Sequence, residues 1–192
     1  MANKHNFTFI QGDIIDLVPL NSEHVNLYVK WENTPSVRIY SRNIIPNTKE
    51  DMKRFFKPSE GRGPKREISF ELWHKKDQKP IGFGEIADID WYGQKAYLGL
   101  IIGETKYWGQ KIGEEATKLL VEYAFNELNL YKLQAQINSP NTGSWRCVEK
   151  NGFIREATLK KDAYVNGKYF DSYFYSLFKD DWLKLKKEKQ VK

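Results

Sequence analysis

The feature that most constrains the fold is a run of three apolar segments in the middle of the chain. They comprise residues 67–73, 81–89 and 96–103, and polar turns separate them. In the first segment Ile68 and Phe70 alternate with polar neighbours, as residues of a half-buried strand do. The three segments therefore predict an antiparallel meander.

The hydrophobic period changes directly after the meander. Apolar side chains recur at helical spacing from Ile112 to about Glu127, and residues 131–137 then return to alternation. A strand, a helix and a strand in this order predict one β-α-β crossover. A meander joined to a single crossover gives an α+β fold.

The flanking regions supply the other predicted elements. The capping residues Asn21 and Ser22 open one helix, and a second short helix starts at Asn47 or Thr48. The inward residues of this second helix are predicted to be Met52, Phe55 and Phe56. The remaining elements are strand material with a Gly-Asp turn at residues 7–20, a loop at 58–66, a helix at 144–150 that ends at Asn151-Gly152, and two closing strands around the turn signal at 165–168.

Composition places these elements in one globular domain. The chain has 192 residues and a net charge of +6, and 40% of its residues are hydrophobic. Residues 183–192 carry five lysines and one glutamate and so account for +4 of that charge. A lysine-rich end of this kind is typical of a solvated tail. We therefore expect a single domain over residues 1–182 and a C-terminal tail over 183–192, without nucleic acid as a partner.

The sequence also limits the compartment and the partners. It has no stretch long and apolar enough to span a bilayer, and its first residues lack the apolar core of a secretion signal. The single cysteine, Cys147, cannot form an intrachain disulfide, which fits a reducing compartment. We therefore expect a cytoplasmic protein without a membrane partner. No cluster of residues has the spacing of metal ligands, so no metal is expected.

A glycine-containing segment precedes the crossover helix. In "KYWGQKIGEEA", residues 106–116, Gly109 and Gly113 flank the predicted start of that helix. A helix N-terminus offers unpaired N–H groups and the positive end of the helix dipole, and glycines let a phosphate approach the backbone. A helix start without any ligand fits the same residues, and the acidic Glu114 and Glu115 favour that alternative.

A second polar segment follows the last strand of the crossover. Within "NSPNTGSWRCVEKNGF", residues 138–153, Asn141 and Ser144 stand three positions apart, directly before a helix. This spacing is typical of helix capping. Side chains at this place would equally face a ligand that lies in the gap between the two strands.

Together these segments resemble the acetyl-CoA-binding half of the GNAT superfamily of N-acetyltransferases, and within it the ribosomal-protein N-acetyltransferase-like branch. The resemblance rests on "YWGQKIGEEA", "VEYAFNELNLYKL", "NTGSWRCVEKNGF" and "NGKYFDSYFYSL", in this order and at the family's spacing. A weaker similarity in "LVPLNSEHVNLYVKW" extends it over nearly the whole chain. The resemblance implies a mixed, mostly antiparallel sheet that is splayed at a central cleft and flanked by helices on both faces.

The resemblance also implies where acetyl-CoA binds, with CoA as the product. The pyrophosphate would lie on backbone N–H groups of the loop made by Trp108, Gly109, Gln110, Lys111, Ile112 and Gly113. The pantetheine arm would pair with the backbone of Leu100, Ile101 and Ile102, and the polar contacts would be Asn141 and Ser144. Lys111 replaces the central glycine of the family's loop. It can offer its N–H if its φ is negative, and its ammonium would add a phosphate contact.

The catalytic residues depart from the family's pattern. Tyr97 stands where many relatives have a glutamate base, Val148 where many have a tyrosine acid, and Ala163 where the ribosomal branch can carry a carboxylate. The branch uses the serine of this motif to stabilise the leaving thiolate, so Ser144 is our candidate for that role. Glu85, on a strand expected to line the cleft, is the candidate general base, and an ordered water is the alternative.

The sequence therefore predicts an acetyl-CoA-dependent N-acetyltransferase that acetylates a primary amine by direct attack. The branch favours a protein N-terminus over a small-molecule amine, and helices and a loop within residues 23–66 are expected to form its pocket. Polyamines are disfavoured because this region reads as basic. One alternative is a catalytically degenerate acyl-CoA-binding or regulatory module, and another is an RNA-associated protein that uses the lysine tail. Family members are often dimers, so a homodimer is one expectation.

Overall fold

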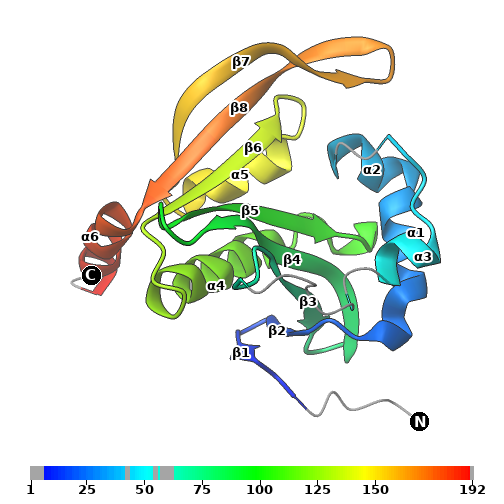
Figure 1. Ribbon diagram of the computed structural model, residues 1–192, viewed down its shortest axis with the longest axis horizontal. Coiled ribbons are helices and arrows are strands. Elements are labelled where there is room, and N and C mark those ends of the chain that lie inside the picture. The colour runs from blue at the N-terminus through cyan, green and yellow to red at the C-terminus, as the bar shows by residue number, and fades with distance from the viewer. Residues whose placement is uncertain (1–6, 42–43, 54–55, 57–62, 191–192) are drawn as a thin grey trace.

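The computed structural model describes residues 7–41, 44–53, 56 and 63–190 of the protein. Within them, eight strands form one sheet in the order β1-β2-β3-β4-β5-β6-β8-β7, in which only β5 and β6 are parallel neighbours (Figure 1). The strands are β1 (Ile10–Gln11), β2 (Ile15–Pro19), β3 (Ile68–His74), β4 (Lys79–Asp90), β5 (Lys95–Ile102), β6 (Lys132–Asn138), β7 (Ile154–Val165) and β8 (Lys168–Phe178). The helices are α1 (Val25–Asn33), α2 (Pro35–Ser41), α3 (Lys49–Lys53), α4 (Ile112–Asn126), α5 (Thr142–Lys150) and α6 (Lys179–Gln190).

The predicted meander is present as β3, β4 and β5. Ile86 of β4 lies opposite Ile68 of β3 and Leu98 of β5 in the strand register. Ile86 and Leu98 are buried in the main core, and Ile68 packs against it. The alternation in the sequence therefore marks the face of the meander that faces this core.

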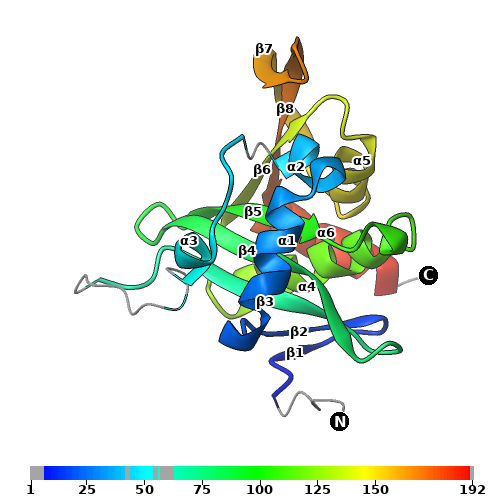
Figure 2. The same cartoon turned by 90° about the vertical axis from the view of Figure 1, so that its right-hand side faces the viewer.

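Helices cover both faces of the sheet, as the resemblance implied. α4 contributes an apolar stripe to the main core, and this stripe includes Ala116, Leu120 and Ala124. On the other face α1 buries Tyr28 and Trp31 in a smaller cluster. Figure 2 shows α1 lying across the strands on that side. The sheet is therefore the middle layer of the molecule.

A gap opens in the sheet between its two parallel strands. β5 pairs with β6 only where residues 95–97 meet residues 132–134. Beyond that point β5 stays paired with β4 up to Ile102, and β6 stays paired with β8 up to Asn138. The predicted splay is thus confirmed, and it widens toward the carboxyl ends of both strands.

Two helices differ from the sequence predictions. α2 lies in a stretch for which no helix is predicted, and Val37 is its one buried residue. α6 includes residues 183–190, which the sequence predicts as a solvated tail, so the boundary expected at 182/183 falls inside a helix. The reason is packing, because Trp182 is buried and its ring lies 5.4 Å from that of Phe125.

The other local predictions are confirmed where the structure describes them. Met52 of α3 is buried, and the closing hairpin turns at Asn166 and Gly167, both at positive φ. Phe55 and residues 57–62 of the predicted loop lie outside the described residues. None of the helices in the described part of the chain has the length and apolar composition needed to cross a membrane.

Candidate active site

The glycine-containing loop connects the end of β5 to α4. After a turn of 3-10 helix at Thr105–Tyr107, the backbone reaches φ +76° at Gly109 and φ +62° at Lys111. The condition set for Lys111, a negative φ, is therefore not met, because this residue is left-handed and directly precedes the first residue of α4. A non-glycine residue in this region is strained by about 1–2 kcal/mol.

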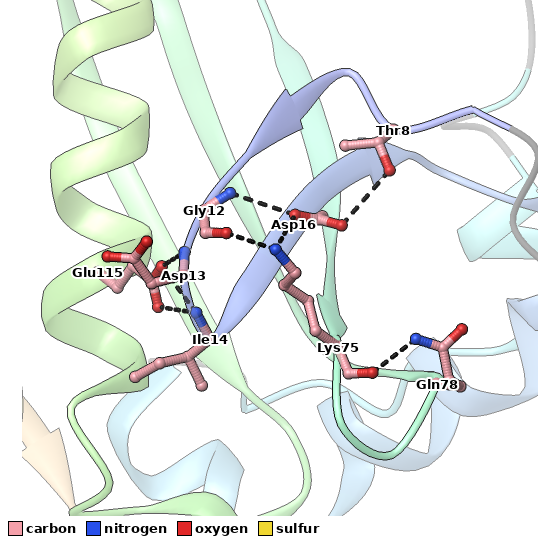
Figure 3. Close-up of polar contacts among 8 residues, drawn as sticks. All are labelled: Thr8, Gly12, Asp13, Ile14, Asp16, Lys75, Gln78 and Glu115. Atoms are coloured by element: carbon pink, nitrogen blue, oxygen red, sulfur yellow. Dashed lines mark hydrogen bonds and ion pairs between the residues drawn. The ribbon is translucent and has the colours of Figure 1, made fainter.

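The N-terminus of α4 is open toward the loop. No side chain caps it, since Lys111 at the cap position makes no such hydrogen bond. The two acidic residues of the first turn are held elsewhere. Glu115 accepts hydrogen bonds from the backbone N–H groups of Asp13 and Ile14 (Figure 3), and Glu114 pairs with Lys150 at 3.0 Å. Because other groups hold both carboxylates, neither is expected to take the place of a bound anion at the helix N-terminus.

The Trp108 side chain fastens this loop to β5. Its indole Nε1 donates to the carbonyl oxygen of Ile102 at 2.8 Å, and its ring lies 6.1 Å from that of Tyr40 in α2. The residues predicted to pair with the pantetheine arm are on the part of β5 that no longer pairs with β6. Of these, Ile102 has a carbonyl oxygen that already accepts the hydrogen bond from Trp108.

The start of α5 brings the two other predicted cofactor residues to the end of β6. The side-chain oxygen of Asn141 accepts from the backbone N–H of Ser144 at 3.2 Å, so Asn141 is a helix cap. The Ser144 side chain is half-buried, and its hydroxyl makes no hydrogen bond to another described residue. This hydroxyl is therefore available to a ligand.

Glu85 lies in β4 on the face that carries α1. Phe83, two residues earlier on the same face, packs against Tyr28 of α1 at 6.4 Å between ring centroids. Gly99 of β5 is opposite Glu85, and a Cβ at Gly99 would lie 2.5 Å from a Glu85 carboxylate oxygen. The carboxylate therefore extends over β5 at Gly99, beside the gap in the sheet.

The surroundings of Glu85 change its acidity. Burial raises its pKa to about 7, and the negative charges of Glu67, Glu32 and Asp88 act in the same direction. A carboxyl that titrates near neutral pH can act as a general base there. The part of the site next to Glu85 therefore holds several carboxylates.

The remaining residues singled out in the sequence have structural places. Val148 and Ala163 are buried and apolar, and the ring of Tyr97 lies 6.1 Å from that of Phe174. Asp90, at the end of β4, accepts a hydrogen bond from the backbone N–H of Gly93 in a turn. Asp171 accepts from Lys160 and from the backbone of Lys161. Burial raises the pKa of Cys147, as for an inert thiol. Within the described residues no group of His, Cys, Asp or Glu side chains could hold a metal.

Sequence reasoning missed two residues of this site. Gly99 makes room for the Glu85 carboxylate, and a glycine inside a predicted strand was a usable signal for such a close approach. Tyr40 contacts the loop through Trp108, but it lies in α2, whose seven residues carry no apolar stripe long enough to predict a helix.

The structure thus has a gap between two strands, an uncapped helix N-terminus beside it and a carboxyl with a raised pKa on the other face. A family profile described as acetyltransferase (GNAT) domain matches residues 15–154. The chain belongs to the GNAT acetyltransferase family. The resemblance seen in the sequence is thereby confirmed, and membership supports acetyl transfer from acetyl-CoA to an amine.

Relatives of this GNAT protein vary in what they are named for. A Bacillus subtilis protein provisionally named N-acetyltransferase YjcK is 31% identical over 60% of this chain and 64% of its own length. The provisionally named ribosomal N-acetyltransferase YdaF of the same species is 27% identical over 88% of this chain and 86% of its own. The crystal structure of a Vibrio cholerae spermidine N-acetyltransferase with CoA and spermine has a TM-score of 0.80 at 18% identity, covering 90% of this chain and 99% of that one. It shares the fold.

Proposed function

We propose that this protein transfers the acetyl group of acetyl-CoA to a primary amine by direct attack, without a covalent enzyme intermediate. The observation that carries the proposal is the Glu85 carboxyl, which has a pKa of about 7 and extends over Gly99 beside the gap between β5 and β6. A base at this place lies beside the part of the sheet where β5 and β6 no longer pair.

The donor half of the site is made mostly of backbone. The pyrophosphate of acetyl-CoA would lie on N–H groups of residues 108–113 other than Lys111, whose backbone is left-handed, where the open N-terminus and the helix dipole of α4 favour an anion. The Lys111 ammonium adds a positive charge. The pantetheine arm would follow the free edge of β5 at Leu100 and Ile101, with the Asn141 and Ser144 side chains as polar contacts on the opposite wall of the gap.

The acceptor half supplies the proton chemistry. Glu85 takes a proton from the acceptor ammonium, so that a neutral amine nitrogen attacks the thioester carbonyl carbon. The C–N bond forms and the C–S bond breaks. The Ser144 hydroxyl donates a hydrogen bond to the departing sulfur, which leaves with the second proton of the nitrogen as CoA. An ordered water can relay either proton without changing these roles.

The acceptor is an amine that enters from the face with α1 and α2. A protein N-terminus and a small-molecule amine both fit this proposal, and the Vibrio cholerae relative was crystallised with the polyamine spermine. A cytoplasmic location is consistent with the half-buried, unpaired Cys147. A homodimer and the absence of a nucleic-acid partner stay predictions.

A thiol-release assay tests the proposed function. The purified protein is incubated with acetyl-CoA and a panel of peptides, amino sugars, amino acids, polyamines and small amines, and acetylated products are identified by mass. We expect CoA release with at least one class of amine. Calorimetric binding of acetyl-CoA without release for any amine would instead favour the degenerate acyl-CoA-binding module. Failure to bind any CoA thioester would contradict both.

A further inference from the structure

A cavity lies beside the gap on the acceptor face. Its volume is about 260 Å³. It is bounded by α2, by the end of β6 and by the tip of the β7–β8 hairpin, three parts that are far apart in the sequence (Figure 1). The lining residues are Ile39, Tyr40, Asn138, Pro140, Val165, Asn166, Lys168 and Phe170.

The position of this cavity connects it to the donor site. Asn138 ends β6 where the gap is widest, and Pro140 directly precedes Asn141 at the start of α5. Tyr40 lines the cavity and also contacts Trp108 of the loop at the start of α4. A molecule in this cavity would therefore lie next to the place where acetyl-CoA is proposed to bind.

The walls of the cavity are mostly apolar, and their one charged side chain is positive. Five of the eight lining residues carry aliphatic or aromatic side chains, and Lys168 is the only charged one. No carboxylate of the described residues pairs with the Lys168 ammonium. On the same hairpin, by contrast, Lys160 is neutralised by Asp171 at 3.0 Å. An exposed ammonium without such a partner, beside an apolar wall, favours an anionic group and disfavours a second cation.

We propose that Lys168 determines acceptor specificity by binding a carboxylate of the acceptor, so that the preferred substrates are carboxylate-bearing primary amines with a compact apolar group. Amino acids and short peptides with a free C-terminus belong to this class. The inference rests on the proposed acetyl transfer and adds the acceptor class. The carboxylates near Glu85 meet the amine end, while the cavity receives the anionic and apolar end.

Matched acceptors test the role of Lys168. The probes are a dipeptide with an apolar side chain, the same dipeptide as its C-terminal amide, and spermidine. For the unaltered protein we expect kcat/KM to be roughly tenfold or more higher for the free acid than for the amide, in line with a charge-assisted hydrogen bond. Lys168→Glu should abolish or reverse this ratio, Lys168→Arg should keep it, and Lys160→Glu on the same hairpin should leave it unchanged.

A binding measurement separates this inference from the proposed function. Calorimetry of the free acid and of the amide with the CoA-saturated protein requires no turnover. If no amine releases CoA but the acid still binds tighter through Lys168, the acetyl transfer is wrong and the carboxylate site stands. Preference for spermidine or for the amide, or equal effects of Lys168→Glu and Lys160→Glu, would overturn the carboxylate site while leaving acetyl transfer intact.

Discussion

At the scale of single residues, the acidity of Glu85 makes the chemistry testable by pH. Because a general base must be deprotonated, kcat/KM should rise with pH through an apparent pKa of about 7. Glu85→Gln is expected to remove this rise and to lower kcat/KM at pH 8 by about a hundredfold or more. A rate profile measured from pH 5.5 to 9 checks both. An unchanged profile in Glu85→Gln would assign the proton transfer to water.

The same carboxyl also affects stability, which gives an independent readout. Its folded pKa is raised, so the folded state binds more protons than the unfolded state between about pH 4.5 and 7. The stability of the protein therefore falls as pH rises through that window. Glu85→Gln should remove this slope and raise the free energy of unfolding at pH 8, as measured in denaturant. A residue that reduces stability where it is ionised fits a functional role better than a structural one.

Lys111 combines backbone strain with a charge next to the expected phosphates, and two substitutions separate them. Lys111→Ala removes the ammonium and keeps the left-handed strain at φ +62°, whereas Lys111→Gly removes both. The glycine variant should be about 1 kcal/mol more stable to denaturant than the alanine variant. Both should bind acetyl-CoA within about tenfold of the unaltered protein by calorimetry. Complete loss of binding in Lys111→Gly would contradict a loop that holds the pyrophosphate through its backbone.

At the scale of elements, α1 is fixed to the end of β5 just before the loop. Trp31 is fully buried and donates its indole N–H to Glu104 at 2.9 Å. A Cβ at Gly103 would overlap with the ring of Trp31. Gly103→Ala should therefore lower the free energy of unfolding by about 1–3 kcal/mol and weaken acetyl-CoA binding. Gly143→Ala is the matched control because a Cβ there meets open space. Equal stability of the two variants would contradict the close packing.

The elements also show what the sequence could and could not predict. The meander and α4 were predictable because residues such as Ile86 and Leu120 repeat at the period of the core they enter. The gap was predictable only from the family resemblance. α2 was not, because with Val37 alone buried it has no period to detect. The left-handed backbone of Lys111 depends on tertiary packing, which local pattern does not encode. For the approach of Glu85 to Gly99 the sequence held a signal, the glycine inside a predicted strand.

At the scale of the whole molecule, α6 connects the C-terminus to the core at the end of the sheet remote from the acceptor cavity (Figure 1). Beyond Trp182, Leu185 lies against Gly152 and Lys186 pairs with Glu122 of α4 at 3.4 Å. The lysine-rich segment is therefore part of the folded domain. If this segment acts through packing, its removal lowers the stability of the protein, whereas the loss of a single exposed charge does not.

Ending the chain after residue 182 should lower the free energy of unfolding by about 1–3 kcal/mol, because Leu185 loses buried contacts. Lys187→Gln, which removes one exposed charge of the same segment, should leave stability within about 0.5 kcal/mol. The folded truncated protein should still bind acetyl-CoA, since Glu122 and Phe125 lie in the C-terminal half of α4, away from the loop at its start. Denaturant unfolding and calorimetry measure the two properties. Unaltered stability of the truncated protein, together with a loss of salt-dependent RNA binding, would support the RNA-associated alternative and a purely electrostatic segment.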